Sequence, residues 1–252
     1  MKKRLIILSG PSCVGKSPLT AAVRKFRPEI KFIQVAVIKS KESRYDKPRP
    51  DELVVWNNPE CWRTMTEIET LKNNPRFVVD YCHGFAQVID LDKIINAPTE
   101  AVLMESYYTM AQKIIKSAYL AGVEIKRVFL SPLSCEEIPA FNDVPYAVRA
   151  LMMFKQYQRA EFHGRTIDRL WLADMRQRIG DAINEIKVAC DYDYVIVNHS
   201  GEGSADWRRN KDGTFFDKPC NDAGQATDCL ADILAGKIPT NAEHWHRDLI
   251  KE

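Results

Sequence analysis

The chain has 252 residues, of which 45% are hydrophobic and 28% charged, and its formal net charge is +2. These values are typical of a globular protein with one sizeable domain, and the near-neutral charge argues against a broad nucleic-acid-binding surface. The seven cysteines are scattered and form no C-x-x-C pair, which argues against a disulfide framework or a zinc site. No segment approaches the roughly 20 apolar residues of a membrane helix, so we expect a cytoplasmic protein without a membrane partner.

The first half of the chain predicts strands that alternate with helices. The continuous apolar run over 4–8 is typical of a strand buried on both faces, and a glycine-bearing turn leads from it into a helix over 17–26. Further along we expect strands over 31–38, 76–81 and 101–105, a loop over 39–52, and helices over 59–72 and 106–121.

The second half continues the alternation. We expect a strand over 125–130, helices over about 144–160 and 166–189, a buried strand over 193–197, a long loop over 200–224, a helix over 226–234 and a polar tail. Alternation of this kind indicates a parallel sheet with helices on both faces. The sequence therefore predicts a three-layer α/β fold with a parallel central sheet.

The turn after the first strand carries a phosphate-binding pattern. Its residues fit G-x-x-x-x-G-K-[ST] and are Gly10, Pro11, Ser12, Cys13, Val14, Gly15, Lys16 and Ser17. Glycines let backbone N–H groups point at a phosphate, and the following helix adds its positive end. We expect Lys16 to reach the β- and γ-phosphates as a catalytic cation, and the Ser17 hydroxyl to ligate Mg²⁺. The sequence thus predicts a site for ATP and Mg²⁺.

Two residues of this turn are unusual. Pro18 also lies in the expected ATP site and is tolerated in the first turn of a helix, where the missing N–H has no intrahelical partner. Cys13 lies near a helix N-terminus and Lys16, which favours a thiolate. The favoured interpretation of Cys13 is a small residue that occupies a glycine position.

Four segments resemble the guanylate kinase family. LSGPSCVGKS over 8–17 is similar to the family's P-loop, which usually reads LSGPSGVGKST. PRPDE over 48–52 resembles the family's PRxGE, HGRT over 163–166 resembles the lid's GRGT, and YVIVN over 194–198 resembles a late strand. Their order and approximate spacing agree with the family from residue 4 to 198.

The resemblance implies a single P-loop kinase domain. Its core would comprise 1–33, 91–132 and 177–252, with an acceptor-binding insert over 34–90 and a lid with an insertion over 133–176. The implied site residues outside the P-loop are Arg49 and Arg44 for the acceptor's phosphate, Arg165 and Arg176 as catalytic lid arginines over the ATP phosphates, and Asn198 near the adenine.

The segments that read the guanine base in this family are altered. Asp80 stands close to the family's first glutamate, and Glu105 matches the first member of an acidic pair whose second member is replaced by Ser106 or Tyr107. Altered polar groups in a base-reading site imply an altered acceptor. A local cap or ion pair is the alternative interpretation of both Asp80 and Glu105.

Extra length falls around 139–160 and 200–225. Tyr146, Phe154, Tyr157 and Arg159 in the first insert could widen the acceptor pocket or contact a larger substrate. In the second insert, aromatic and basic groups occur together at Trp207, Arg208, Arg209, Phe215 and Phe216, which would suit single-stranded nucleic acid. The favoured interpretation is that hydrophobic side chains anchor long loops, so a nucleic-acid partner is not favoured.

The expected activity is transfer of the γ-phosphoryl group of ATP to a phosphorylated small molecule, first a nucleoside monophosphate such as GMP or dGMP. One alternative is a non-guanine acceptor: another nucleotide, a sugar phosphate such as ribose 1,5-bisphosphate, or a modified base in DNA. The other alternative is a non-catalytic binding module of the same family.

Overall fold

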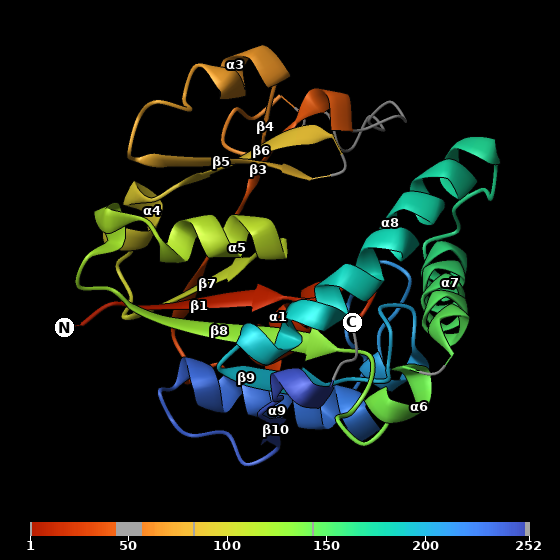
Figure 1. The fold of residues 1–252 in the computed structure, drawn as a ribbon. Helices are drawn as coiled ribbons and strands as arrows, with labels where there is room; N and C mark the ends of the chain where they lie inside the picture. The colour runs from red at the N-terminus through yellow and green to blue at the C-terminus, as the bar shows by residue number, and fades with distance from the viewer. Residues whose placement is uncertain (1, 44–56, 83, 143, 250–252) are drawn as a thin grey trace. The chain divides into compact units, whose positions relative to one another are not determined.

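The computed structural model describes residues 2–43, 57–82, 84–142 and 144–249 (Figure 1). The chain divides into two compact units. The first comprises Met1–Ile7 and Phe32–Ile125, and the second comprises Leu8–Lys31 and Lys126–Glu252.

The first unit contains two sheets. In one, the strands follow the order β1 (Arg4–Ser9), β7 (Ala101–Glu105) and β2 (Phe32–Val35), and β2 is parallel to β7 with Phe32 opposite Ala101. The other has the order β4 (Trp62–Arg63), β3 (Ile38–Ser40), β6 (Phe85–Asp90) and β5 (Phe77–Cys82). Strands β5 and β6 are antiparallel, with Phe77 opposite Asp90.

Short helices complete the first unit: α3 (Met65–Glu69), α4 (Asp92–Ile95) and α5 (Tyr108–Ile115). The hydroxyl of Thr64 accepts the N–H of Glu67, whose carboxylate in turn accepts the N–H of Thr64, so a capping box fixes the start of α3. The main core of this unit lies among β1, β7, α4 and α5 and includes Leu5, Ile7 and Val102, all fully buried.

The second unit holds the strands β8 (Glu124–Ser131), β9 (Tyr194–Val197) and β10 (Ala242–Glu243) in the order β10-β9-β8. Strand β9 is parallel to β8 with Tyr194 opposite Val128, whereas β10 is antiparallel to β9. The predicted α/β class with a largely parallel sheet is confirmed, and the short terminal strand is its antiparallel exception.

The helices of the second unit are α1 (Lys16–Phe26), α6 (Ile138–Asn142), α7 (Pro145–Phe162), α8 (Arg169–Lys187) and α9 (Asn221–Leu234). Helix α7 packs against α8, and α1 packs against α9. The carboxylate of Asp168 accepts the N–H of Trp171 at 2.8 Å and caps the start of α8.

Several expected elements differ from the structure. The strand expected over 31–38 is two strands, β2 and β3, which belong to different sheets. The helix expected over 59–72 is reduced to α3, because Trp62–Arg63 pairs with β3 instead. Strand β6 and strand β10 were not expected, and α9 begins at Asn221 rather than 226. For β3, β4 and β10 the deciding factor is pairing with a distant segment, which local periodicity does not record. Strand β6 instead forms a tight hairpin with its neighbour β5.

No helix in the described part of the chain is both long enough and apolar enough to cross a membrane.

Candidate phosphate-binding site

The P-loop lies in the second unit, between the end of β1 and the start of α1. Gly15 is the N-cap of α1 and has φ of 100°, a left-handed conformation that favours glycine. A Cβ there would lie 2.8 Å from Cζ2 of Trp207 and 2.9 Å from Nδ2 of Asn198. No side chain caps the start of α1, and its first turn has no acidic residue. The first N–H groups of the helix therefore favour an anion.

The carbonyl groups of the P-loop are held from outside the loop. The Asn198 amide donates to the carbonyl of Val14 at 2.7 Å, and the N–H of Glu202 donates to the carbonyl of Cys13 at 2.8 Å. Lys16 donates to the carbonyl of Pro11 at 2.8 Å and also to that of Gly10. These bonds fix the direction of the loop's peptide groups.

Asn198 has a structural role in addition to the one that the resemblance implied. It is fully buried, and its amide donates to the carbonyls of Val14 and Ser200, both at 2.7 Å. In this structure Asn198 therefore positions the P-loop, and its contact with an adenine stays a prediction.

Cys13 adopts a left-handed conformation with φ of 71°, which explains why glycine is usual at this position in the family. Its thiol donates to the Gln156 carboxamide and lies 3.5 Å from Nη1 of Arg159. Burial raises the pKa of the Cys13 thiol, although the Arg159 guanidinium acts in the opposite direction. Cys13 therefore occupies a position of glycine-like conformation with its thiol packed inside the protein, which agrees with the favoured interpretation.

Helix α7 turns polar side chains toward the P-loop and the segment that holds it. Lys155 is buried and donates to the carbonyl of His199, and burial lowers the pKa of Lys155 to about 8. Arg159 lies 3.1 Å from the carboxylate of Glu202, and His163 lies 3.3 Å from it. Burial alone would raise the pKa of Glu202, but His163 and Arg159 outweigh it and lower the pKa to about 2.

Arg178 was missed by the sequence analysis. Arg165 and Arg176, the predicted lid arginines, are both exposed. The α8 arginine with a described contact to the P-loop is Arg178, whose Nη1 lies 3.4 Å from the Ser12 hydroxyl and whose Nε donates to Asp174 at 2.6 Å. The buried positions Trp171, Met175 and Ile179 mark the inner face of α8, and this apolar periodicity could have identified Arg178 at its flank.

Glu185 is a second residue that the sequence analysis missed. It is buried on α8, and burial raises the pKa of its carboxyl group to about 7, while the positive charge of Lys16 acts in the opposite direction. The carboxyl group can therefore exchange a proton near neutral pH.

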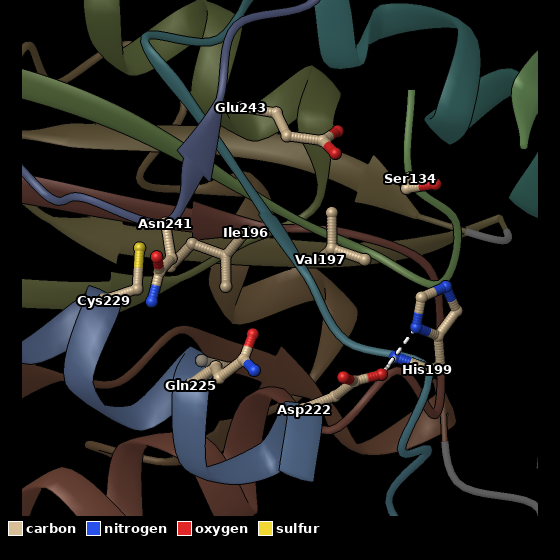
Figure 2. Close-up of a pocket in the computed structure, with 10 residues that line it drawn as sticks. Ser134, Ile196, Val197, His199, Asp222, Gln225, Cys229, Asn241 and Glu243 are labelled. Atoms are coloured by element: carbon tan, nitrogen blue, oxygen red, sulfur yellow. Dashed lines mark hydrogen bonds and ion pairs between the residues drawn. The ribbon is translucent and has the colours of Figure 1, made fainter. Parts of the chain in front are cut away.

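A cavity of about 320 Å³ lies beside the end of β9 (Figure 2). It flanks the P-loop anchor Asn198, because Val197 and His199 both line it. Its polar lining comprises Ser134, His199, Asp222, Gln225, Asn241 and Glu243, and its apolar lining comprises Ile196, Val197, Ala226 and Cys229. Carboxylates and carboxamides dominate its polar groups, and no lysine or arginine is among the described lining residues.

His199 joins two carboxylates at the edge of this cavity. Its Nδ1 lies 2.5 Å from Asp222 and its Nε2 lies 2.7 Å from Glu137. Burial lowers the pKa of His199, but the hydrogen bonds to Glu137 and Asp222 outweigh it, so the net shift is upward. The imidazolium form therefore fastens the start of α9 to the segment that follows β8.

The predicted acceptor residues in the first unit have local partners. Asp80 is buried, lies 2.7 Å from Nζ of Lys113 and accepts the hydroxyl of Thr109. Glu105 accepts Nε2 of Gln34 at 3.0 Å. Arg44 and Arg49 lie outside the described residues. The alternative interpretation of Asp80 as part of an ion pair matches this geometry.

The long loop after β9 is anchored by its aromatic side chains. Trp207 is fully buried and donates to the carbonyl of Gly201 at 3.0 Å, and Phe215 packs edge-on against Phe26 with centroids 5.4 Å apart. Arg209 lies 4.6 Å from the ring centroid of Phe162. Hydrophobic anchoring, the favoured interpretation of this insert, agrees with the burial of Trp207 and Phe215 but not with Phe216, whose side chain is 66% exposed.

The described residues contain no cluster of three or more histidine, cysteine, aspartate or glutamate side chains arranged to hold a metal ion. Ser17, the predicted Mg²⁺ ligand, is the second residue of α1 and is exposed. Its hydroxyl is a hard oxygen donor, which fits a Mg²⁺ ion bound chiefly through phosphates and water.

No family model matches the chain. A guanylate kinase from Desulfitobacterium hafniense (strain Y51) is 25% identical over 198 residues, which cover 77% of this chain and 81% of that protein. A guanylate kinase from Synechococcus sp. (strain JA-3-3Ab) is 25% identical over 201 residues, which cover 79% of this chain and 77% of that protein. The solved guanylate kinase from Anaplasma phagocytophilum has a TM-score of 0.49 and 15% identity over 98% of this chain and 93% of that chain. The two sequence matches confirm the predicted resemblance.

We expect Gly15→Ala to destabilise the protein more than Gly213→Ala does. Both glycines are left-handed, with φ of 100° and 87°, but only at Gly15 would the added Cβ meet Trp207 and Asn198. The control should lose about 1–2 kcal/mol of unfolding free energy, and Gly15→Ala about 1–3 kcal/mol more. Urea unfolding measures both losses. Equal losses would show that the contacts with Trp207 and Asn198 do not constrain the loop.

We expect the His199 pairing to make stability depend on pH. Because the folded pKa of His199 is raised above its ordinary value of 6.5, the stabilisation is complete below that value and is lost as the pH rises through the folded pKa. The difference in unfolding free energy between the wild type and His199→Gln should therefore be greatest below about pH 6.5 and shrink as the pH rises above it. His246→Gln, at an exposed position, is the control. A difference independent of pH would contradict the pairing.

Proposed function

We propose that this guanylate-kinase-like chain is an ATP·Mg²⁺-dependent phosphotransferase whose acceptor is a phosphorylated small molecule. The observation that carries the proposal is the P-loop itself. Its peptide groups are fixed by Asn198 and Glu202, and the helix start that follows it has no side-chain cap. A rigid array of N–H donors with a neighbouring lysine suits the phosphates of a nucleoside triphosphate.

Phosphoryl transfer requires positive charge around the transferred group. Lys16 would move from the carbonyls of Gly10 and Pro11 to the phosphates, and Ser17 would hold Mg²⁺. Mg²⁺ supplies charge neutralisation when bound. Arg178 lies against Ser12 and is the third candidate cation, with Arg165 and Arg176 as the lid arginines that the family resemblance implies.

The cavity beside His199 is the proposed location of the nucleotide base. It flanks the residue that anchors the P-loop, so a nucleotide bound through its phosphates could extend into it. The carboxamide oxygens of Gln225 and Asn241 suit a base that presents N–H donors, as the amino group of adenine does. Asp222 already pairs with His199, and Glu243 already accepts from Cys135 and Trp245. The apolar side chains Ile196, Val197 and Ala226 would contact the faces of the ring.

A non-guanine acceptor is the second candidate function, and one observation favours it. Asp80 forms an ion pair with Lys113 and accepts from Thr109, and Glu105 accepts from Gln34. Carboxylates with such partners have fewer free lone pairs for the N–H groups of guanine. Another nucleotide, a sugar phosphate such as ribose 1,5-bisphosphate, or a modified base in DNA then becomes the acceptor.

The activity is tested by following ADP release from ATP·Mg²⁺ with GMP, dGMP, other nucleoside monophosphates, ribose 1,5-bisphosphate and DNA. We expect turnover with a phosphorylated acceptor. Lys16→Ala should lose this turnover, because Lys16 neutralises the charge around the phosphoryl group that is transferred. ATP binding without turnover on any acceptor would count against the enzyme and support the non-catalytic binding module. Turnover with GMP or dGMP alone would exclude the non-guanine candidate.

The two α8 arginines can be separated by comparing Arg178→Ala with Arg176→Ala. We expect Arg178→Ala to lower kcat roughly a hundredfold, the scale for one preorganised donor to transition-state charge, because Arg178 already contacts the P-loop. Arg176→Ala should lower kcat less than about tenfold, because the side chain is exposed. The reverse order would mean that Arg176 reaches the phosphates when substrate binds, as the resemblance implies.

A further inference from the structure

His199 lies between the residue that anchors the P-loop and the cavity beside β9. The preceding residue, Asn198, donates to the carbonyl of Val14 in the P-loop and to that of Ser200. The side chain of His199 lines the cavity and pairs with Asp222, which lines it as well (Figure 2). A displacement of His199 would therefore act both on the cavity and on the residue that holds the phosphate loop.

Both ring nitrogens of His199 face carboxylate oxygens. Nδ1 lies 2.5 Å from the carboxylate of Asp222, and Nε2 lies 2.7 Å from that of Glu137. An ionised carboxylate only accepts hydrogen bonds, whereas a neutral imidazole has one N–H donor and one lone pair. The ring can therefore hold both carboxylates only in its imidazolium form. We call this three-residue arrangement the His199 clasp.

The two carboxylates of the clasp differ in what else holds them. Asp222 also lies 3.3 Å from the backbone nitrogen of His199, a contact that does not depend on the charge of the ring. Glu137 accepts the N–H of Ser134 at 2.7 Å through the same oxygen that faces the ring. Burial alone would raise the pKa of Glu137, but the bonds from Ser134 and His199 outweigh it and lower the pKa. Loss of the ring's proton should therefore release Glu137, whereas Asp222 keeps a backbone donor.

The other charged groups around the clasp come from α7 and β10. Lys155 of α7 donates to the carbonyl of His199, and its positive charge interacts favourably with Asp222 and Glu137. Glu243 of β10 lines the cavity. Two cations thus face the two carboxylates of the clasp while the ring is protonated. Loss of that proton leaves an additional net negative charge beside a cavity whose described lining contains no lysine or arginine.

We propose that the His199 clasp makes nucleotide binding depend on pH. The protonated clasp holds segment 134–137 against His199 and favours an anionic nucleotide. The deprotonated clasp releases Glu137, loosens the cavity wall that Ser134 forms, and repels the nucleotide's negative charge. This inference rests on the proposed function, because its ligand is the nucleotide that the cavity and the P-loop would share.

The direction of the pH dependence follows from the contacts of the ring. Burial alone would lower the pKa of His199, but the hydrogen bonds to Glu137 and Asp222 outweigh it and raise the pKa above 6.5. The clasp is therefore complete below pH 6.5 and opens as the pH rises through the folded pKa. Because the side chain of His199 is 43% exposed, the ring can exchange its proton with solvent directly. Nucleotide affinity should accordingly fall as the pH rises.

The clasp is tested first without a ligand. The ring resonance of His199, followed by NMR and assigned by its loss in His199→Gln, should titrate with a midpoint above 6.5. Glu137→Gln should lower this midpoint, because it removes one of the two negative partners. Amide protection over 133–138, measured by hydrogen exchange, should fall at the same midpoint, while protection in α5 should not. The shared midpoint separates His199 from Lys155, whose pKa burial lowers to about 8.

The coupling is tested by isothermal titration of ATP·Mg²⁺ at a series of pH values on either side of the ring's midpoint. The wild-type affinity should fall roughly fivefold through the midpoint, the low end for coupled sites, because the ring is half-exposed. His199→Gln should remove this fall. His246→Gln, at an exposed position, is the matched control and should keep it. Circular dichroism checks that each variant is folded, and Glu137→Gln provides a second, milder variant whose affinity should fall at a lower pH.

The outcomes separate the clasp, its coupling and the proposed function. A ring midpoint at or below 6.5, or protection over 133–138 that does not follow the ring, would overturn the clasp. ATP binding with the same pH dependence in the wild type and His199→Gln would overturn the coupling and leave the proposed function intact. Failure to bind ATP at any pH would contradict the proposed function and the coupling together, and the ligand-free measurements would still decide on the clasp.

Discussion

The structure of the candidate site depends on two hydrogen bonds to P-loop carbonyls. The Asn198 amide holds the carbonyl of Val14, and the N–H of Glu202 holds that of Cys13. A peptide group whose carbonyl is fixed has its N–H fixed as well, so these bonds orient the donors that would meet a phosphate. Glu202 is stabilised in turn by Arg159 and His163, which makes an ion cluster part of the loop's support.

Helix α7 contributes to the support of the P-loop through one of its faces. Its polar face supplies Lys155, Gln156 and Arg159 to the P-loop and to the segment after β9, which leaves its aromatic residues to face solvent. The pKa of Lys155 is lowered to about 8 by burial, whereas the pKa of Glu202 is lowered to about 2 despite burial. The surroundings of the P-loop thus combine a lysine that can lose its charge near neutral pH with a carboxylate that stays ionised.

Local sequence was sufficient for the strand, turn and helix around Gly10–Ser17, because this context is contiguous in the chain. Local sequence was also sufficient for the α/β class, because the alternation of strands and helices can be followed along the chain. Local sequence was not sufficient for Arg178 and Glu202, because their contacts with the P-loop join segments far apart in the sequence. For Asn198 the sequence identified the strand that carries it but not its hydrogen bond to Val14. Strand β10 was missed because its existence depends on pairing with β9, which lies far away in the sequence. Strand β6 was missed although it forms a tight hairpin with its neighbour β5.

Gly203 shows how tightly α7 is joined to this support. A Cβ on Gly203 would lie 2.5 Å from the carbonyl oxygen of Gln158 and 2.9 Å from the nitrogen of Arg159, so the two backbones are in direct contact. Contacts between backbones have no flexible side chain that can absorb a displacement. Glu202, the neighbour of Gly203, bonds to Cys13 in the P-loop. A displacement of α7 at Gln158 would therefore be transmitted to the phosphate loop through Gly203 and Glu202.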